Sequence, residues 1–203
     1  MKSIRIIYSA LMLLLPFTVS AISPSDALKK AKDKIGACKS LSADFKMTTG
    51  GKTSSGQLKT KGNKFYISTS YSSNWYDGAN LYTYNPGNSE TTIFRPTAEE
   101  LQAINPMLYL NASANFNVVG SKQSNKGEET VVLLPKNNKT GVKNVTIRLN
   151  STTFLPKSIE VTPSSGAKIT IQISKLTLNP NISDSQFVYP SSKYPKVKIN
   201  DMR

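Results

Sequence analysis

The stretch LSADFKMT, residues 41–48, alternates strictly between apolar and polar side chains. Because successive side chains of a strand point to opposite faces, Leu41, Ala43, Phe45 and Met47 would share one face. The residues just before this stretch follow a helical period instead. The sequence therefore predicts a helix that gives way to a half-buried strand at Leu41.

The helix that precedes this strand has a clear start. Ser23 can cap it, Pro24 suits its first turn, and Asp26 completes a capping-box pattern. Its apolar residues recur every three or four positions and form one stripe: Leu28, Ala31, Ile35 and Cys38. Such a stripe has to be buried against another part of the fold.

Alternating segments separated by turn residues continue to the end of the chain. Six strands are expected between residues 41 and 95 and five between residues 115 and 178, with Asp77-Gly78 as the strongest hairpin signal. Between the two groups, residues 97–100 start a helix that Pro106 interrupts. The pattern predicts a mainly β (α+β) single domain with a curved antiparallel sheet of about eleven strands. Helices packed on its concave face would leave room for an apolar cavity.

The composition excludes several functional classes. The 203 residues include no His and one Cys, so there is no Ser-His-Asp triad, no structural zinc set, no His-ligated haem and no internal disulfide. We expect no cofactor and no metal. Carboxylate-only chemistry remains possible in principle, but the best carboxylate pairs, Glu99-Glu100 and Glu128-Glu129, are adjacent in sequence on segments that look exposed, which suggests a solvated surface. The sequence therefore predicts a binding protein and no enzyme.

The first 21 residues have the pattern of a secretory signal peptide. Lys2 and Arg5 precede an apolar run, and Val19-Ser20-Ala21 offers small residues for cleavage after Ala21. A membrane anchor is the alternative, but the run is shorter than the roughly 20 residues that span a bilayer. Residues 35–38 (IGAC) look like the lipidation box of a lipoprotein. That signal requires its cysteine directly after the apolar stretch, whereas lysines precede Cys38 here. We expect a signal peptide over 1–21 and one domain over 22–203.

The chain is strongly basic. Its formal net charge is +14, and +12 remains after residues 1–21, which hold two basic and no acidic residues. Nucleic acid is not an expected partner, because residues 22–203 contain only three arginines and the lysines are scattered. Attraction to anionic lipid headgroups or to an acidic partner is one interpretation of the charge. A merely solvated lysine surface is the other.

Five motifs in a fixed order resemble a known family. They are the helix leading into SLSADF (40–45), GQL (56–58) followed by KGNKF (61–65), YDGANLYTYNP (76–86), LPK (134–136), and DSQFVYP (184–190) with the closing KVKIND (196–201). In this order and spacing the chain resembles the periplasmic outer-membrane lipoprotein carriers. The resemblance implies an open, incomplete barrel of about eleven strands, with helices as a lid over an apolar cavity.

The resemblance also implies partners. Such a carrier receives acylated lipoproteins or lipids from an inner-membrane lipoprotein-releasing transporter, shields their acyl chains in the periplasm, and passes them to an outer-membrane acceptor. We expect it to act as a monomer. The family also includes lipid-binding relatives and a stress-signalling regulator, so a lipid- or lipoprotein-sensing regulatory module is the alternative function.

The residues expected around the cavity come from the strands and from the helix near Pro106. The candidates for the lining are Phe45, Met47, Phe65, Ile67, Trp75, Tyr82, Tyr84, Leu101, Ile104, Met107 and Leu108. The last four are expected to form the lid. Many relatives have an Arg-Pro step where this chain has Lys61-Gly62, and that arginine is thought to hold the lid helices. Lys61 is therefore the candidate latch, although lysine lacks the planar fork of arginine.

Overall fold

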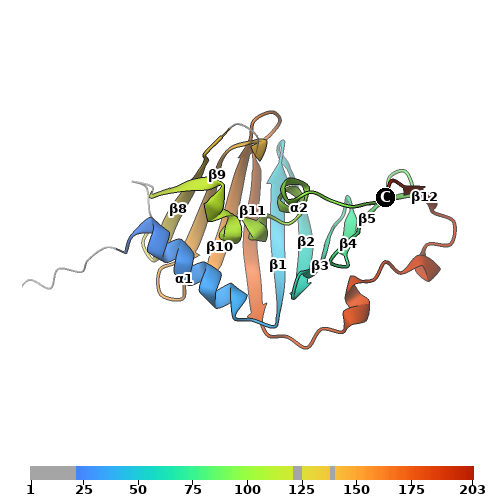
Figure 1. The fold of residues 1–203 in the computed structure, drawn as a ribbon, viewed down its shortest axis with the longest axis horizontal. Coiled ribbons are helices and arrows are strands. Elements are labelled where there is room, and N and C mark those ends of the chain that lie inside the picture. Colours follow the sequence, from blue (N-terminus) through green and yellow to red (C-terminus); the bar gives the residue numbers. More distant parts are fainter. Residues whose placement is uncertain (1–21, 121–124, 138–139) are drawn as a thin grey trace, which may run out of the picture.

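A single large sheet dominates the computed structural model, which describes residues 22–120, 125–137 and 140–203 (Figure 1). The predicted signal peptide, residues 1–21, lies outside the described residues. The twelve strands of the described chain lie in the spatial order β12-β6-β5-β4-β3-β2-β1-β11-β10-β9-β8-β7. Because β7 and β12 have no neighbour on their outer sides, the sheet curves without closing.

The strands appear in chain order with short connections. The first group is β1 (Ser40–Thr49), β2 (Lys52–Lys61), β3 (Lys64–Thr69), β4 (Ser73–Tyr76), β5 (Leu81–Asn85) and β6 (Glu90–Phe94). The second is β7 (Phe116–Gly120), β8 (Glu128–Pro135), β9 (Val142–Asn150), β10 (Pro156–Pro163) and β11 (Ile169–Leu178). These eleven strands match the expected number. A twelfth, β12 (Lys198–Asp201), was not predicted and pairs with β6 in parallel.

The helices begin where the sequence indicates. In α1 (Pro24–Gly36) the Ser23 side chain accepts a hydrogen bond from the Asp26 amide at 3.1 Å. In α2 (Ala98–Ile104) Thr97 and Glu100 form the predicted reciprocal capping box. The helix ends at Ile104, and a 3-10 helix, η1 (Pro106–Ala114), continues after Asn105. No helix of the described residues is both long and apolar enough to cross a bilayer.

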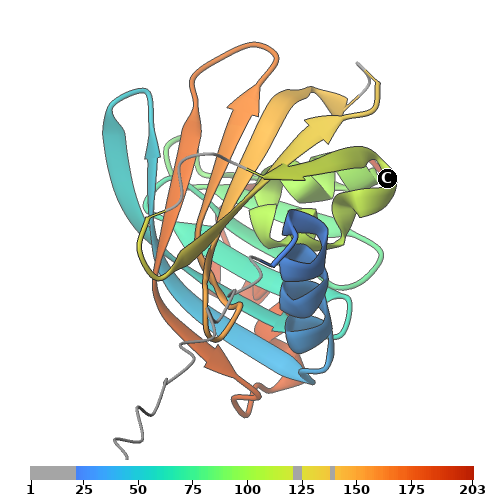
Figure 2. The ribbon, with the colours of Figure 1, turned by 90° about the vertical axis from the view of Figure 1, so that its left-hand side faces the viewer.

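Two apolar clusters form the core. One joins α1 and part of η1 to β8, β9 and β10, with Ala27, Leu28 and Ala31 of α1 almost fully buried. The other lies on the concave face of β1, β2, β3 and β11, where half-buried residues of α2 and η1 pack onto it. Figure 2 shows α1 and the green helical segments inside the curve of the sheet. Helix α1 is therefore core, while α2 covers the other half of the concave face.

The alternation in residues 41–48 is confirmed by the register. Leu41, Ala43, Phe45 and Met47 are buried or half-buried in the concave cluster. Met47 lies opposite Ile171 on β11 and Phe45 opposite Ile173. Directly opposed residues of antiparallel strands share a face. The pairing of β1 with β11 thus brings residues far apart in the chain into one apolar surface.

Gly56 lets the Phe45 ring lie close against β2. Gly56 is directly opposite Phe45 in the register. A Cβ atom at position 56 would come within 2.5 Å of Phe45 Cε2 and of the Ser68 backbone oxygen. No real Cβ atom tolerates such contacts. The missing side chain therefore creates the space in which the Phe45 ring packs.

A C-terminal strap, residues 179–197, links β11 to β12. It contains two short 3-10 helices, η3 (Asp184–Phe187) and η4 (Ser191–Lys193). Figure 1 shows it, in orange to red, leaving the end of β11 and passing along the first group of strands to β12. Its first residues are tied to β1, because Ser40 Oγ donates to the Pro180 carbonyl at 2.5 Å.

Candidate functional site

The space between the concave face and the lid, defined as α2 with η1, holds three cavities. A cavity of about 310 Å³ lies under α2 and is called the α2 cavity. A cavity of about 230 Å³ lies beside η1 and is called the η1 cavity. A third, of about 20 Å³, lies between them beneath Asn105, Pro106 and Met107. The three follow one another along the apolar face of β1, β2 and β3.

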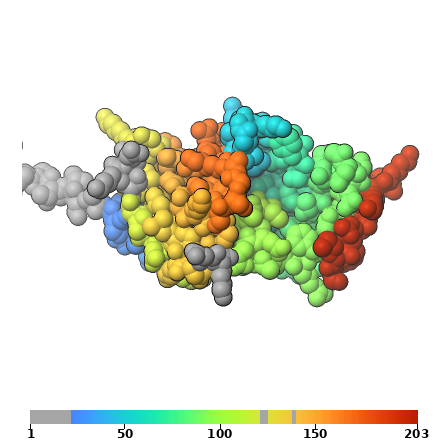
Figure 3. All heavy atoms as spheres, turned by 90° about the horizontal axis from the view of Figure 1, so that it is seen from above, coloured from blue at the N-terminus to red at the C-terminus, as the bar shows by residue number. Residues whose placement is uncertain are grey.

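The α2 cavity is mostly apolar. Its floor includes Phe45, Met47 and Ile67. On the lid side it is bounded by Ile104 and Pro106. Figure 3 looks onto the end of the molecule that holds the β1–β2 turn and shows a hollow between the cyan and green segments. An apolar chain could therefore enter from this end.

One end of the α2 cavity is polar. Thr83 Oγ1 donates to Asn74 Oδ1 at 2.9 Å, and Asn74 Nδ2 donates to Ser72 Oγ at 3.3 Å. Asn74 is only 7% exposed although it lines the cavity. Buried amides need such partners, because an unpaired polar group in an apolar site is costly. The cavity thus combines an apolar floor with one hydrogen-bonding end.

The η1 cavity has an apolar inner part and a polar rim. Leu41, Phe65, Met107 and Leu108 supply apolar surface, while Asn63, Lys64 and Asn111 contribute polar groups. Cys38, the single thiol of the chain, also lines it; this residue is half-buried and donates to the Lys34 carbonyl. The η1 cavity is therefore less apolar than the α2 cavity and has a charged group close to its mouth.

The lid is anchored at one end and loosely seated at the other. In η1, Tyr109, Leu110 and Ala112 are buried in the cluster that contains α1. None of the residues of α2 is buried. Between them Asn105 is 2% exposed, and its side chain accepts a hydrogen bond from the Met107 amide at 3.2 Å. The buried surface therefore fixes η1, while α2 is held by half-buried contacts of Leu101 and Ile104 with the concave cluster.

The structure brings most of the expected lining residues together. Seven of them line one or more of the three cavities: Phe45, Met47, Phe65, Ile67, Ile104, Met107 and Leu108. Leu101 lines none of the three and packs, half-buried, against the concave cluster. The four residues expected in the lid all lie in α2 or η1.

The prediction that Trp75, Tyr82 and Tyr84 line the cavity is corrected by the structure, because these side chains lie on the opposite, convex face of the sheet. Trp75 is opposite both Tyr66 and Tyr82 in the register, whereas the neighbouring Tyr76 is opposite Phe65 of the concave cluster. The strap covers this convex aromatic group. Its Tyr189 packs edge-on against Trp75 at 5.4 Å and stacks on Tyr82 at 5.6 Å between ring centroids, and Tyr194 packs against Tyr84 at 4.4 Å.

The predicted role of Lys61 as the latch of the lid is also corrected by the structure. Its ammonium group donates to the Ile182 carbonyl at 3.2 Å and to Asp184 Oδ2 at 2.8 Å. Both acceptors belong to the strap and not to α2 or η1. The hydrogen bonds from Lys61 and Lys64 hold the pKa of Asp184 below its ordinary value. Lys61 therefore fastens the strap to β2 and does not latch the lid.

Sequence reasoning missed the contribution of β11. Ile171 lines both the α2 cavity and the small one, and Ile169 and Ile173 each line one of them. Their spacing of two is visible in the sequence and predicts a shared strand face. What the sequence does not show is that β11 lies beside β1. That pairing decides which strand completes the cavity floor.

The α2 cavity and the small cavity offer mainly apolar binding surface. Within the described residues, no three His, Cys, Asp or Glu side chains come together in a way that could hold a metal ion. The α2 cavity and the small one are bounded by alkyl, aromatic and thioether groups, with amides and hydroxyls at one end. Such surfaces retain apolar ligands by removing them from water.

An open curved sheet with a helical lid over apolar cavities defines a class of lidded open barrels. The sequence model of the family described as outer membrane lipoprotein carrier protein LolA matches residues 15–165. The chain belongs to this family, which confirms the resemblance seen in the motifs. A search of curated protein sequences finds no match.

Solved structures with this fold are distant in sequence. An uncharacterized conserved protein from Thermus thermophilus superposes with a TM-score of 0.57 at 8% identity, covering 87% of this chain and 98% of that one. A DUF1329 family protein from Desulfovibrio piger gives 0.50 at 13%, with 86% and 100% covered. A LolA superfamily protein from Nitrosomonas europaea gives 0.43 at 14%, with 83% and 99% covered. At these identities the first two likenesses describe the fold alone.

Proposed function

We propose that this protein is a periplasmic carrier that holds the acyl chains of lipoproteins, or of lipids, between the lid and the concave face. The observation that carries the proposal is the α2 cavity, whose apolar floor is covered by a helix with no buried residue. Membership of the lipoprotein carrier family supports it. The protein acts by binding and release, without a chemical step.

The energetics explain why loose cavities suit a carrier. Each acyl CH₂ taken out of water contributes about 0.8 kcal/mol, so several chains together remain in a membrane almost permanently. A soluble carrier that bound as tightly could not release its cargo. Separate cavities under a weakly seated lid cover the chains while leaving them exchangeable. Extraction from the membrane then needs an energy source outside this chain, which fits an inner-membrane lipoprotein-releasing transporter as donor.

The polar end of the α2 cavity would orient the cargo. Acylated cargo has apolar chains joined to ester or amide carbonyls, which accept hydrogen bonds. Ser72, Asn74 and Thr83 can exchange their mutual hydrogen bonds for bonds to such carbonyls. The chains would then lie along Phe45 and Ile67, with the polar part of the cargo outside and available to an outer-membrane acceptor.

An apolar fluorescent dye tests the cavity. Folded protein with the N-terminus at Ile22 should bind the dye saturably, and a diacylated peptide should displace it, whereas the same peptide without acyl chains should not. A transfer arm separates carrier from sensor: a carrier passes its cargo to acceptor vesicles, and a sensing module retains it. Absence of dye binding by a cooperatively folded sample would contradict the cavity.

The exported location has its own test. The protein purified from the periplasm should begin at Ile22, because small residues precede that position and signal peptidases require them. Intact-mass measurement gives the N-terminus directly. Replacing Ala21 with Leu should block cleavage and leave the longer chain at the membrane. A chain that still begins at Met1, or an acylated Cys38, would contradict the proposed location.

A further inference from the structure

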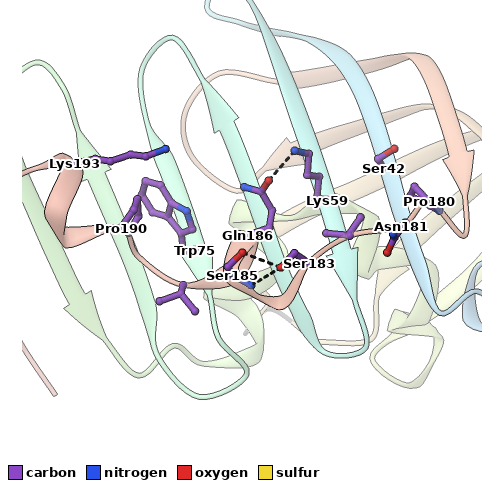
Figure 4. A pocket seen from close by; sticks show the side chains of 12 residues that line it. Ser42, Lys59, Trp75, Pro180, Asn181, Ser183, Ser185, Gln186, Pro190 and Lys193 are labelled. Atoms are coloured by element: carbon purple, nitrogen blue, oxygen red, sulfur yellow. Dashed lines mark hydrogen bonds between the residues drawn. The ribbon is translucent and has the colours of Figure 1, made fainter.

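The convex face carries a separate cavity of about 410 Å³ beneath the strap, called the strap groove. It lies between strap residues 180–193 and the outer faces of β1, β2 and β4, and Figure 4 shows its lining side chains. It shares no lining residue with the three cavities under the lid. The acyl-binding proposal therefore makes no use of it.

Charge in the strap groove is one-sided. Its lining includes Lys59 and Lys193 and no acidic residue. The single carboxylate of the strap, Asp184, is already paired with Lys61 at 2.8 Å and Lys64 at 3.3 Å. Neither Lys59 nor Lys193 has a carboxylate within 4 Å in the described parts of the chain. Two ammonium groups in one concave site thus lack a counter-charge.

Lys59 is held in place. Its side chain is half-buried, and its ammonium group donates to Gln186 Oε1 at 2.9 Å, as Figure 4 shows. An ammonium group has three N–H donors, so two remain unused. The hydroxyl of half-buried Ser42 and the ammonium of Lys193 also have no partner within the described residues. The unused groups are mainly donors, which suits a ligand that only accepts hydrogen bonds.

The remaining walls give the groove a flat apolar side. Trp75, Val188 and Pro190 line it. A cavity of this size exceeds what a bare anion fills, so the ligand should carry an organic part as well. A negatively charged group that only accepts hydrogen bonds, joined to a small organic part with C–H surface, describes a phosphate ester of a small polyol, and lysine is a common partner of phosphate.

We infer that the strap groove binds the phosphate ester of a small polyol, with Lys59 on the phosphate, exposed Lys193 adding positive charge at the rim, and Val188, Pro190 and the accessible edge of Trp75 against the polyol. Two sources share this chemistry: the headgroup of an anionic glycerophospholipid in a bilayer, and a free phosphate ester. The inference does not rest on the acyl-carrier function, and it assigns part of the excess positive charge to one place on the molecule.

The test uses a natural reporter, because Trp75 is the only tryptophan of the chain. Glycerol 3-phosphate is titrated into the protein that begins at Ile22 while Trp75 fluorescence is followed, with glycerol as the uncharged probe. A saturable change with glycerol 3-phosphate only is expected. The double variant Lys59→Gln with Lys193→Gln should weaken binding at least tenfold, while Gln at position 59 can still donate to Gln186. Lys59→Arg, which keeps the charge, should retain binding within a few fold.

A matched pair of substitutions outside the groove controls for the loss of net charge. Lys52→Gln with Lys126→Gln removes the same two charges from exposed positions outside the groove, one at the start of β2 and one in the turn before β8, and should bind within twofold of the wild type. Vesicles of phosphatidylglycerol or phosphatidylcholine identify the source. Selective cosedimentation with phosphatidylglycerol, lost in the groove variant only, indicates the lipid headgroup; binding of glycerol 3-phosphate alone indicates a free ester.

If both variant pairs weaken binding equally, the charge of the whole molecule and not the groove attracts the ligand, and the proposed site is wrong. The site is also wrong if about 10 mM glycerol 3-phosphate gives no response, because a weaker affinity would not be of interest. Thermal unfolding of each variant shows whether it is folded. Dye binding under the lid, measured on the same samples, should be unchanged, so failure of the groove and failure of the acyl cavity are told apart.

Discussion

At the scale of single residues, the packing of Phe45 depends on a missing side chain opposite it. Gly56→Ala places a methyl group where the Phe45 ring and the Ser68 carbonyl already lie. Overpacking of this kind costs about 1–3 kcal/mol, because the ring has to leave its position. We expect a lower free energy of unfolding by that amount in urea, and a weaker apolar dye signal, since Phe45 lines the α2 cavity.

Gly36→Ala is the matched control for this change. A Cβ at position 36 meets nothing within 4 Å, and the residue ends α1. Alanine there should leave stability unchanged or raise it by up to about 1 kcal/mol. If Gly56→Ala and Gly36→Ala unfold at the same urea concentration, the tight approach of Phe45 to β2 is not a constraint.

Single residues also show where sequence reasoning fails. The alternation through Phe45 and Met47 is local, so it predicts the buried face correctly. On β4 the side-chain polarity is opposite to what a buried face predicts, because the polar Asn74 faces the cavity while the apolar Trp75 faces outward. Polarity alone assigns the tryptophan to the core. It is in fact buried, but under the strap, and no local pattern reveals which face a distant segment will cover.

At the scale of elements, α2 can act as a lid because its apolar side is only half-buried, with Ile104 over the α2 cavity and Leu101 against the concave cluster. Ile104→Asp would put a carboxylate on that side, which costs several kcal/mol if the group stays buried. We expect α2 to lift instead. Binding of diacylated peptide should then fall at least tenfold, while the melting temperature changes by only a few degrees. Binding and thermal unfolding are measured on the same sample.

Ala98→Asp provides the control for the added charge. Ala98 belongs to the same helix, is exposed, and lies in the first turn, where a carboxylate is tolerated. It should bind cargo as the wild type does. The lid assignment for α2 is wrong if Ile104→Asp lowers the melting temperature sharply and the remaining folded protein binds normally, since that is how ordinary core behaves.

The strap is a second element with a specific fastening. Asp184→Asn removes the carboxylate that Lys61 and Lys64 share. We expect amides of residues 183–188 to exchange several-fold faster at pH 7 by hydrogen–deuterium exchange. Asp33→Asn is the control, because Asp33 is a carboxylate of similar exposure that forms an ion pair with Lys29 on α1. If these amides exchange equally fast in the wild type and in Asp184→Asn, Asp184 does not fasten the strap.

The same carboxylate gives the strap a pH dependence. Hydrogen bonds from Lys61 and Lys64 lower the pKa of Asp184 below 3.8. The ionised form is therefore favoured in the folded state, and its contribution is present above pH 3.8 and lost as the pH falls through the lower folded value. Trp75 fluorescence, which reports on the covering Tyr189, should be constant from pH 7 to 5 and change only below pH 3.8.

Elements with local signals could be predicted, and those without could not. The N-cap at Ser23, the capping box at Thr97 and the interruption at Pro106 are each encoded within a few residues, and all three occur. At Ser23 the reciprocal half of the predicted box is missing, because the Asp26 carboxylate accepts a hydrogen bond from Ser23 Oγ. Strand β12 has no alternation that separates it from a loop. It forms because the strap delivers it to the open edge of β6, which is a property of the whole chain.

At the scale of the whole molecule, one strand pair joins two cores. β1 and β11 pair from Leu41–Leu178 to Thr49–Ile169. The buried residues of this pair belong to the cluster beneath the lid, and β10, the next strand beyond β11, already belongs to the cluster with α1. Both clusters include half-buried Ile35 and Met107 at their borders. Any ligand that fills the cavities beneath the lid therefore acts on a cluster that shares its boundary with the rest of the fold.

This continuity leads to a prediction about stability. A ligand that binds only the folded state stabilises it by about 2.7 kcal/mol at a hundred times its dissociation constant. For a domain of this size that amounts to a rise in melting temperature of roughly 5–10 °C. Diacylated peptide should produce this rise in a single transition, because β1 and β11 belong to both halves of the sheet. Calorimetry of the protein from Ile22 measures it.

The deacylated peptide and the Ile104→Asp variant are the two controls for this measurement. Without acyl chains the peptide has nothing to fill the apolar floor formed by Phe45 and Ile171, so no rise is expected. With the lid lifted, the acylated peptide should give less than half of the rise, since its chains would stay partly in water. A rise of equal size with both peptides would place binding outside the cavities, and two separate transitions would show that the halves unfold independently.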